Sequence, residues 1–240
     1  MSRPRLRLDV VRAAELDEGA FVELWRLRGR LIDVQVSVEP ADDFAAFRSF
    51  FAGAGWVSRI VDEGGALRGF LGWHLRGVET PAGRRPVLDT DYFFIEPELR
   101  GHSIMARLCA DVCARAALAH RSARVILVGH GYPSSLLSGA RFAERVVFLQ
   151  DADAAGWERE AIFGFCERFC GRSFDVGRCL VKMRTTPKEP GRTPKSPQTR
   201  ALLRRFEAHD PAWSEGWGLP YLLHYTPRSL AAGAWRMIRG

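Results

Sequence analysis

Two aspartates on one short segment could supply a base. Asp89 and Asp91 stand one residue apart in Val87-Leu-Asp-Thr-Asp-Tyr-Phe-Phe-Ile95, whose β-branched and aromatic residues favour a buried strand. Side chains alternate along a strand, so both carboxylates are expected on the same face. Such carboxylates can take a proton from an attacking group, directly or through water. The alternative is a pair of solvated carboxylates at a strand end.

A turn suited to phosphate follows this strand. Pro97 ends the strand because it has no N–H to donate, and Arg100-Gly101 leads into a run with Ser103 as its candidate cap. Apolar residues of that run recur at a spacing of four, which predicts one face of a helix: Ile104, Leu108, Val112 and Ala116. A tight turn before a helix N-terminus offers free backbone N–H groups and the positive end of the helix dipole. The alternative is an ordinary strand-to-helix connection.

The stretch Ile95-Glu-Pro-Glu-Leu-Arg-Gly-His-Ser-Ile-Met-Ala-Arg-Leu108 resembles the acyl-CoA-binding motif of the GCN5-related N-acetyltransferases, loosely Val-x-Pro-x-x-Arg-Gly-x-Gly-x-Gly/Ala-x-x-Leu. The match covers five positions: Ile95, Pro97, Arg100, Gly101 and Leu108. The chain departs at Ser103 and Met105, where the motif has small residues that let the backbone wrap around the pyrophosphate. The resemblance implies an α/β fold with a mixed sheet. In that fold an antiparallel meander joins a splayed pair of parallel strands, and the acyl-pantetheine arm lies in the cleft between the pair.

The same resemblance implies roles for particular residues. Contacts to the acyl-CoA fall on the strand end, the turn and the first helical turn: Phe93, Phe94, Ile95, Arg100, Gly101, His102, Ser103, Ile104 and Met105. A carboxylate on the strand near the acceptor amine makes Asp89 and Asp91 the candidate bases. The family commonly uses a tyrosine on the helix after the fifth strand to return a proton to the thiolate. The corresponding stretch 135–142 has none, which leaves the upstream Tyr132 as the candidate acid.

Four other side chains are weaker candidates. Glu96 and His102 fall in the turn, where they are expected to face solvent. His74, on the preceding strand, and His130, in the loop after the next strand, could line the cleft. A single histidine in such a position is more often a hydrogen-bonded structural group than a catalyst.

Periodicity places these residues in an ordered succession of elements. The first half reads as strand 6–12, helices 13–30 and 42–51, strands 56–62, 66–76 and 87–95, and helix 100–119. Glu63-Gly64-Gly65 predicts a hairpin turn between two of the strands. An apolar run at 124–128 predicts a buried parallel strand that completes a β-α-β unit with 87–95. A short helix from Ser134 or Ser135 to Phe142 and a strand at 145–149 follow.

The last third exceeds the minimal plan of the family that the motif resembles. Helices are predicted at 154–169, 199–209 and 227–238, and a last strand at 218–225. Residues 184–199 hold four prolines and few apolar groups, which predicts a flexible loop. We therefore expect an acyl-CoA-binding core over residues 1–150. Residues 151–240 are expected to form an extension of extra helices that packs on this core.

Composition narrows the class of protein. The 240 residues carry a formal net charge of +7, spread along the chain without a Lys/Arg tract, which argues against a nucleic-acid role. Neither a run of about 18 apolar residues nor an apolar stretch after the basic N-terminus occurs, so neither a membrane span nor a secretory signal is expected. Five cysteines point to reduced thiols in the cytoplasm. The pairs Cys109/Cys113 and Cys166/Cys170 favour buried thiols over a zinc site.

The residues and the resemblance together predict an N-acyltransferase of cytoplasmic location. It would move an acyl group from acetyl-CoA or another acyl-CoA to the amine of an unidentified small molecule or peptide, without a metal. Two alternatives stay open: a non-catalytic acyl-CoA-binding or protein-interaction module, and an enzyme whose acyl donor is an acidic acyl carrier protein docked by the basic segment 182–205. Assembly as a homodimer is also left open.

Overall fold

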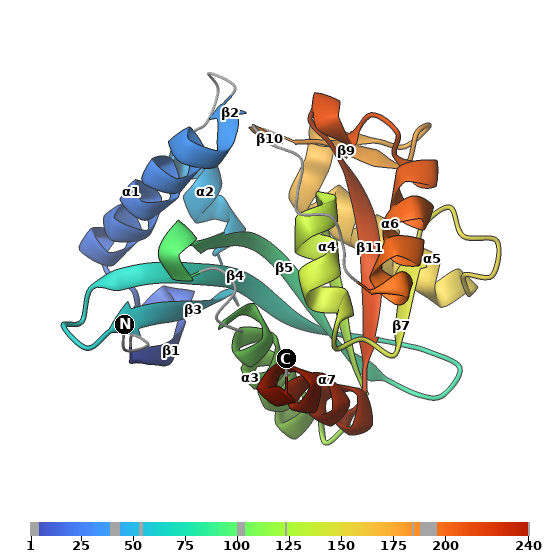
Figure 1. Ribbon diagram of the computed structural model, residues 1–240, viewed down its shortest axis with the longest axis horizontal. Helices are drawn as coiled ribbons and strands as arrows, with labels where there is room; N and C mark the ends of the chain where they lie inside the picture. The colour runs from blue at the N-terminus through green and yellow to red at the C-terminus, as the bar shows by residue number, and fades with distance from the viewer. Residues whose placement is uncertain are drawn as a thin grey trace.

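A mixed sheet of nine strands organises the described part of the chain (Figure 1). The computed structural model describes residues 5–38, 44–52, 55–99, 104–122, 124–183, 185–187 and 196–239. The strands of this sheet are β1 Leu6–Arg12, β3 Gly55–Asp62, β4 Leu67–Val78, β5 Arg85–Ile95, β6 Val125–Gly131, β7 Arg145–Phe148, β8 Phe174–Asp175, β9 Leu180–Lys182 and β11 Trp217–Tyr225. Their order is β1-β3-β4-β5-β6-β11-β9-β8, with β7 also paired to β11.

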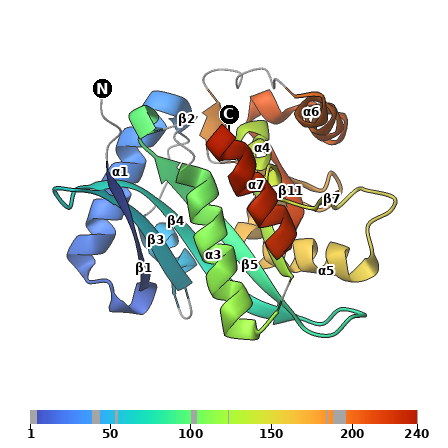
Figure 2. The same ribbon diagram turned by 60° about the horizontal axis from the view of Figure 1, so that its bottom comes forward.

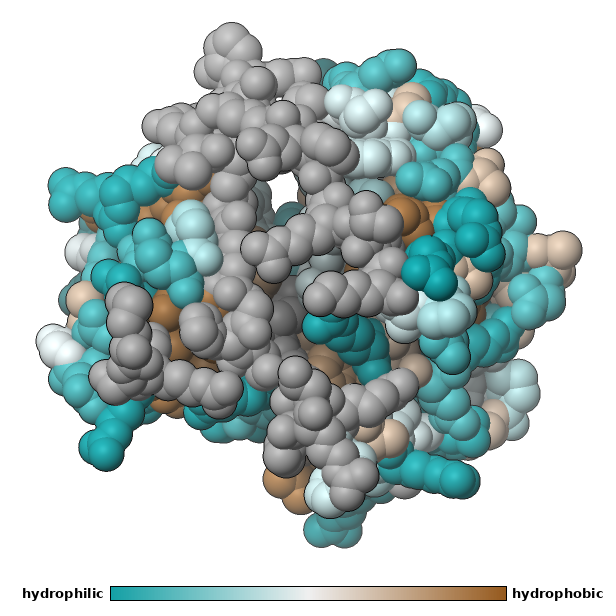
Figure 3. Space-filling view, viewed as in Figure 1, coloured by the Kyte–Doolittle hydropathy of each residue, from teal (hydrophilic) through white to brown (hydrophobic). Residues whose placement is uncertain are grey.

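Helices cover both faces of this sheet. Over the described residues they are α1 Glu18–Gln35, α2 Phe44–Phe50, α3 Ile104–His120, α4 Pro133–Ala140, α5 Gly156–Phe165, α6 Pro197–His209 and α7 Pro227–Arg239. One apolar cluster joins α3, α4, α6 and α7 to one face, and Figure 2 shows α3 and α7 lying side by side there. Two further apolar clusters lie on the opposite face. One contains residues of α1 and α2, and the other contains residues of α5. On the side seen in Figure 3 the described residues are largely hydrophilic, with apolar side chains in separate small areas.

The predicted antiparallel meander is confirmed. β3 pairs with β4 and β4 with β5, and the hairpin between β3 and β4 turns at Gly65, whose φ is +81°. Glycine takes that left-handed conformation without steric cost. The first helix differs from its predicted start at residue 13, because Asp17 caps it: its Oδ1 accepts the Ala20 N–H at 2.7 Å. α1 therefore begins at Glu18.

The β-α-β unit at the centre is also confirmed. β5 and β6 run parallel, joined through α3. The predicted apolar face of α3 is buried against the sheet throughout: Ile104, Leu108, Val112 and Ala116. Cys109 and Cys113 share this buried surface as predicted. Among the described residues no group of three or more histidine, cysteine, aspartate or glutamate side chains could hold a metal ion, and no helix there could span a membrane.

The last third of the chain contributes directly to the sheet. β11 lies between β6 and β7, so the predicted last strand is next to the β-α-β unit rather than at an edge. The short strands β8 and β9 were not predicted. Nor was the small second sheet, in which β10 Thr185–Pro187 pairs with β2 Val36–Val38. β10 falls within the predicted flexible loop 184–199; residues 184 and 188–195 of that loop lie outside the described residues.

A buried carboxyl group after α6 makes the stability of the fold dependent on pH. Asp210 has no exposed surface, and the contact of its carboxylate with the Ala212 backbone is too weak to offset this burial. Burial raises the pKa of Asp210 to about 6. The folded chain therefore binds this proton more tightly than the unfolded chain does, and stability is lost as the pH rises through 6.

We therefore expect Asp210→Asn to increase the free energy of unfolding by about 1–2 kcal/mol above pH 6 and to change it little at pH 4. The measurement is urea unfolding at both pH values. A variant equally destabilised at the two would show that the carboxylate is solvated in the folded state.

Candidate functional site

β5 and β6 form a fork in the middle of the sheet. They pair at three positions only, Val87–Asp89 against Ile126–Val128. Beyond these, β5 continues to Ile95 alongside β4, and β6 continues to Gly131 alongside β11. At the branch point the Thr90 hydroxyl donates a hydrogen bond to the Val128 carbonyl at 3.2 Å. The fork, residues 90–95 and 129–131, is thus bordered by two strand edges that no ladder joins.

A bulge in β5 explains why the strands separate. One residue of β4, Leu71, faces two residues of β5, Tyr92 and Phe93. Tyr92 has φ +54°, and the Asp91 carboxylate accepts its backbone N–H at 2.7 Å. A bulge bends its strand and increases the local twist. β5 therefore turns away from β6 just past the branch point, where the sequence analysis placed the candidate bases.

Asp89 lies in an enclosed ion pair. Its carboxylate is fully buried and accepts hydrogen bonds from Arg76, at 2.6 Å from Nε and 3.0 Å from Nη2. Arg76 also donates to the Ala161 carbonyl of α5 at 3.0 Å. Burial raises the pKa of Asp89, while the bonds from Arg76 act in the opposite direction. Both oxygens are engaged, so this pair ties β4 and β5 to α5; the role of Asp89 as a base stays a prediction.

Asp91 occupies the same face of β5, as the alternation predicted, but is only half-buried. Its carboxylate is close enough to His130 on β6 and to Tyr221 on β11 to raise the pKa of each. One carboxylate therefore acts on groups from two further strands.

His130 faces Asp91 across the fork with a cysteine beside it. Its Nδ1 lies 4.0 Å from the Cys170 sulfur, and its ring centroid is 5.7 Å from that of Phe165. Burial lowers the pKa of His130, but Cys170 and Asp91 raise it by more. Contact with Cys166 and burial raise the pKa of the Cys170 thiol, which stays protonated. Of these two groups, Asp91 is therefore the one that carries a negative charge facing His130.

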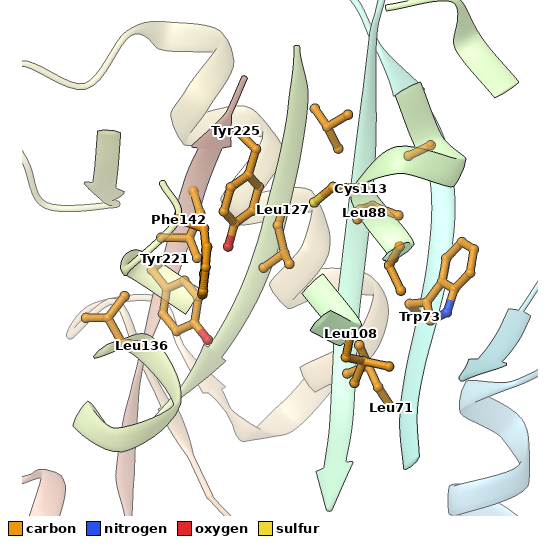
Figure 4. Packing of buried hydrophobic residues seen from close by; sticks show 14 of the residues in the cluster. Leu71, Trp73, Leu88, Leu108, Cys113, Leu127, Leu136, Phe142, Tyr221 and Tyr225 are labelled. Atoms are coloured by element: carbon orange, nitrogen blue, oxygen red, sulfur yellow. The ribbon is translucent and has the colours of Figure 1, made fainter. Parts of the chain in front are cut away.

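Tyr221 reaches the branch point from the other face. A Cβ atom placed on Gly129 would lie 3.7 Å from the Tyr221 hydroxyl, 3.0 Å from the Thr90 hydroxyl and 3.3 Å from the Thr90 carbonyl. Gly129 thus leaves a narrow space that any side chain would fill. Figure 4 shows the rings of Tyr221 and Tyr225 extending from β11 toward β6. Burial raises the pKa of Tyr221, as do Cys109 and Asp91.

The predicted acyl-CoA contacts fall in several places. Phe93 packs on the α3 side, Phe94 on the α1 side, and Ile95 and Ile104 share one small apolar cluster below the turn. Pro97–Leu99 forms a 3₁₀ turn that leads toward α3. Arg100, Gly101, His102 and Ser103 lie outside the described residues, as does the side chain of Met105. Their contacts therefore stay predictions.

The remaining candidates are away from the branch point or engaged elsewhere. Tyr132 precedes the first turn of α4, after the end of β6, and is half-buried. His74 is buried and hydrogen-bonded through Nε2 to the Phe50 carbonyl, which makes it a structural group. The expectation that Glu96 faces solvent is wrong. Its carboxylate is largely buried and forms an ion pair with Arg68, with 2.8 Å between Arg68 Nε and Glu96 Oε2.

A separate hollow lies on the α1 side of the sheet. Its volume is about 330 Å³, and it is lined by Gly19, Glu23, Arg26, Leu27, Arg30, Ala66, Leu67, Arg68 and Glu96. Arg30 and Arg68 both approach the Glu96 carboxylate, at 3.8 and 2.8 Å. The cationic side chains there are thus partly neutralised by a carboxylate within the hollow.

Sequence reasoning did not identify two residues of this site. Tyr221 is one apolar-looking position of a predicted strand, and nothing in the order of the chain shows that this strand lies beside β6. Arg76 is eighty-five residues from its partner Ala161. The alternating pattern of the predicted strand that ends at Arg76 does not indicate that this arginine contacts Asp89 or Ala161.

Comparison with known proteins gives partial structural likeness. No family model and no curated protein matches the chain. A probable N-acyltransferase from Enterococcus faecalis V583 is 18% identical with a TM-score of 0.38, over 61% of this chain and 36% of that one. Escherichia coli ElaA is 12% identical with a TM-score of 0.43, over 63% and 95%. An acyl-CoA N-acyltransferase from Pseudomonas aeruginosa is 13% identical with a TM-score of 0.40, over 55% and 83%.

The chain thus spans about a third of the length of the first of these proteins. What its own sheet establishes is the mixed fold, in which an antiparallel meander joins a splayed parallel pair of strands.

Proposed function

We propose that this chain is an N-acyltransferase of the GCN5-related N-acetyltransferase family, moving an acyl group from acyl-CoA to an amine. The observation that carries the proposal is the fork between β5 and β6. It combines two unjoined strand edges, a bulge at Tyr92 and a half-buried carboxylate at Asp91. An extended acyl-pantetheine arm carries amide groups that can pair with a strand edge as a third strand would.

The charge of the donor fits the same proposal. CoA carries a pyrophosphate, and the chain has a formal net charge of +7, which favours anionic ligands. In the sequence, the motif residues Arg100 and Gly101 come shortly before α3, and a helix N-terminus suits a phosphate. Gly129 carries no side chain next to Thr90, which suits close approach of the unbranched thioester end of the pantetheine arm.

Roles for the two aspartates follow from their surroundings. An amine must lose a proton as it attacks the thioester carbonyl. Asp91 is our candidate for this base, because its carboxylate is half-exposed at the fork. Asp89 is assigned a positioning role, since both of its oxygens are held by Arg76. It fixes β5 next to the branch point, which places Asp91.

The direct test is calorimetry of the purified chain with acetyl-CoA and with longer acyl-CoAs at low salt. We expect saturable binding that weakens with added salt, because an exposed pyrophosphate contact is screened. Absence of binding by every acyl-CoA would reject the proposal. Binding followed by release of free thiol in the presence of primary amines would extend the proposal from binding to catalysis.

Filling the space at the branch point should block the ligand. We expect Gly129→Val to weaken acetyl-CoA binding at least tenfold, because its side chain would meet Thr90 and approach Tyr221. Gly156→Ala is the matched control, since a Cβ there has no neighbour within 4 Å. Thermal unfolding of both variants shows whether they stay folded. Unchanged affinity in a folded Gly129→Val chain would place the ligand elsewhere.

A non-catalytic acyl-CoA-binding module is the second candidate. It is favoured by α4, which has no tyrosine and whose Ser138 hydroxyl donates to the Ser134 carbonyl at 2.7 Å. That hydroxyl is therefore engaged within its own helix. Under this alternative acetyl-CoA binds but no thiol is released with any amine, so the calorimetry and the thiol assay together separate the two candidates.

A further inference from the structure

A nearly buried hydroxyl at the fork has no hydrogen-bond partner among the described residues. Tyr221 is only 6% exposed, yet its hydroxyl forms no hydrogen bond with any described residue. The fully buried side-chain atoms that lack a partner among the described residues do not include the Tyr221 oxygen. This oxygen therefore keeps contact with solvent. Tyr225, four residues further along β11, differs: its hydroxyl donates to the Gly139 carbonyl at 3.1 Å.

The position of the Tyr221 hydroxyl suits contact with a ligand. It lies near the position of a Cβ on Gly129, beside Thr90, where β5 and β6 part. Because the Tyr221 hydroxyl keeps contact with solvent but has no described protein partner, a water molecule or a ligand can take the place of that partner. The nearest unpaired strand edges are those of the fork, which the proposed function assigns to the thioester.

We propose that Tyr221 is the general acid of acyl transfer, donating its proton to the sulfur of the departing CoA. This inference rests on the proposed function and adds a catalytic residue from β11. The tyrosine expected on the helix after β6 is absent, and β11 brings another phenol to the branch point from the next strand. Tyr132, at the start of α4, then has no part in proton transfer.

The proton balance of the step is complete. The amine nitrogen forms a bond to the thioester carbonyl carbon, and Asp91, directly or through water, takes the proton that the nitrogen loses. The carbon–sulfur bond breaks, the electron pair goes to sulfur, and the phenol proton of Tyr221 passes to it. Water then carries the proton from Asp91 to the Tyr221 phenolate, which restores both groups, and free CoA and the amide leave. The raised pKa of Tyr221 keeps the phenol protonated before this step.

The test compares Tyr221→Phe with Tyr225→Phe, using release of free thiol from acetyl-CoA in the presence of a panel of primary amines. We expect Tyr221→Phe to lower kcat about 100-fold with the KM for acetyl-CoA within about twofold, because only proton donation is removed. Tyr225→Phe loses a structural hydrogen bond but should keep kcat within about threefold. Calorimetry with acetyl-CoA on both variants checks that the binding site stays intact.

A second readout separates proton donation from a structural role. An acetyl thioester of a thiophenol expels a weakly basic thiolate that needs no proton. With this donor the deficit of Tyr221→Phe should shrink to less than about fivefold. An equal deficit with both donors, or an unchanged kcat with acetyl-CoA, would overturn the role of Tyr221 while leaving acyl-CoA binding in place. A wild-type chain that binds no acetyl-CoA, or releases no thiol with any amine, would overturn the proposed catalysis as well.

Discussion

Asp91→Asn should lower kcat for acyl transfer about 1,000-fold and leave the affinity for acetyl-CoA within about threefold. The asparagine amide keeps an oxygen that can accept the Tyr92 N–H, so the bulge that opens the fork is preserved. What is lost is the group that takes the proton of the attacking amine. The measurement is release of free thiol from acetyl-CoA with the amine panel, together with calorimetry of acetyl-CoA binding.

Asp111→Asn is the control for this experiment. Asp111 is a carboxylate on α3, paired with Arg115 at 2.8 Å on the helix surface and not at the fork. Its loss should leave kcat unchanged within about twofold, because exposed ion pairs contribute little. If Asp91→Asn and Asp111→Asn are equally active, the base is not Asp91, and the half-buried position of that carboxylate has another cause.

Asp89→Ala should lower the free energy of unfolding by about 3 kcal/mol, because it leaves the Arg76 guanidinium without its anion in a largely enclosed position. The effect on catalysis would follow from the loss of fold and not from the loss of a base. Urea unfolding followed by fluorescence measures the change directly.

The double substitution Arg76→Met with Asp89→Leu separates these roles. Replacing a buried ion pair by apolar side chains of similar size is often neutral, so we expect most of the lost stability to return. Acyl transfer should return with it, to within about tenfold of the wild type. A double variant that is stable but inactive would identify Asp89 as the base and contradict the role assigned to Asp91.

Much of the fold could be read from the sequence because local patterns determine it. The spacing of Ile104, Leu108 and Val112 predicts the buried face of α3, and the alternation in β4 and β5 predicts the meander. Parallel pairing of β5 with β6 follows from the helix between them. Each of these depends on residues near one another in the chain.

The parts that could not be read depend on contacts between distant segments. β11 joins β6 although more than eighty residues separate Gly131 from Trp217, and β7 comes between them in the chain. The register of such a pairing depends on how both faces of the sheet pack. The sequence pattern of one strand does not predict that packing. Tyr221 was therefore read as part of a strand and not as part of the site.

The two aspartates show the same limit within a single strand. Alternation correctly placed Asp89 and Asp91 on one face, but it assigned them the same surroundings. The two carboxylates differ in burial and partners. Asp89 is enclosed by Arg76 and α5, whereas Asp91 lies beside the bulge at Tyr92. A positive φ at a tyrosine is imposed by the ladder around it, since the residue itself disfavours that conformation.

A crystal structure of the chain with acetyl-CoA tests the central claim most directly. The account predicts the pantetheine arm between β5 and β6, with the CoA sulfur within about 3.5 Å of the Tyr221 hydroxyl and the acetyl group facing Asp91. Acetyl-CoA seated instead in the hollow lined by Arg26, Arg30 and Arg68, with the fork closed, would contradict it.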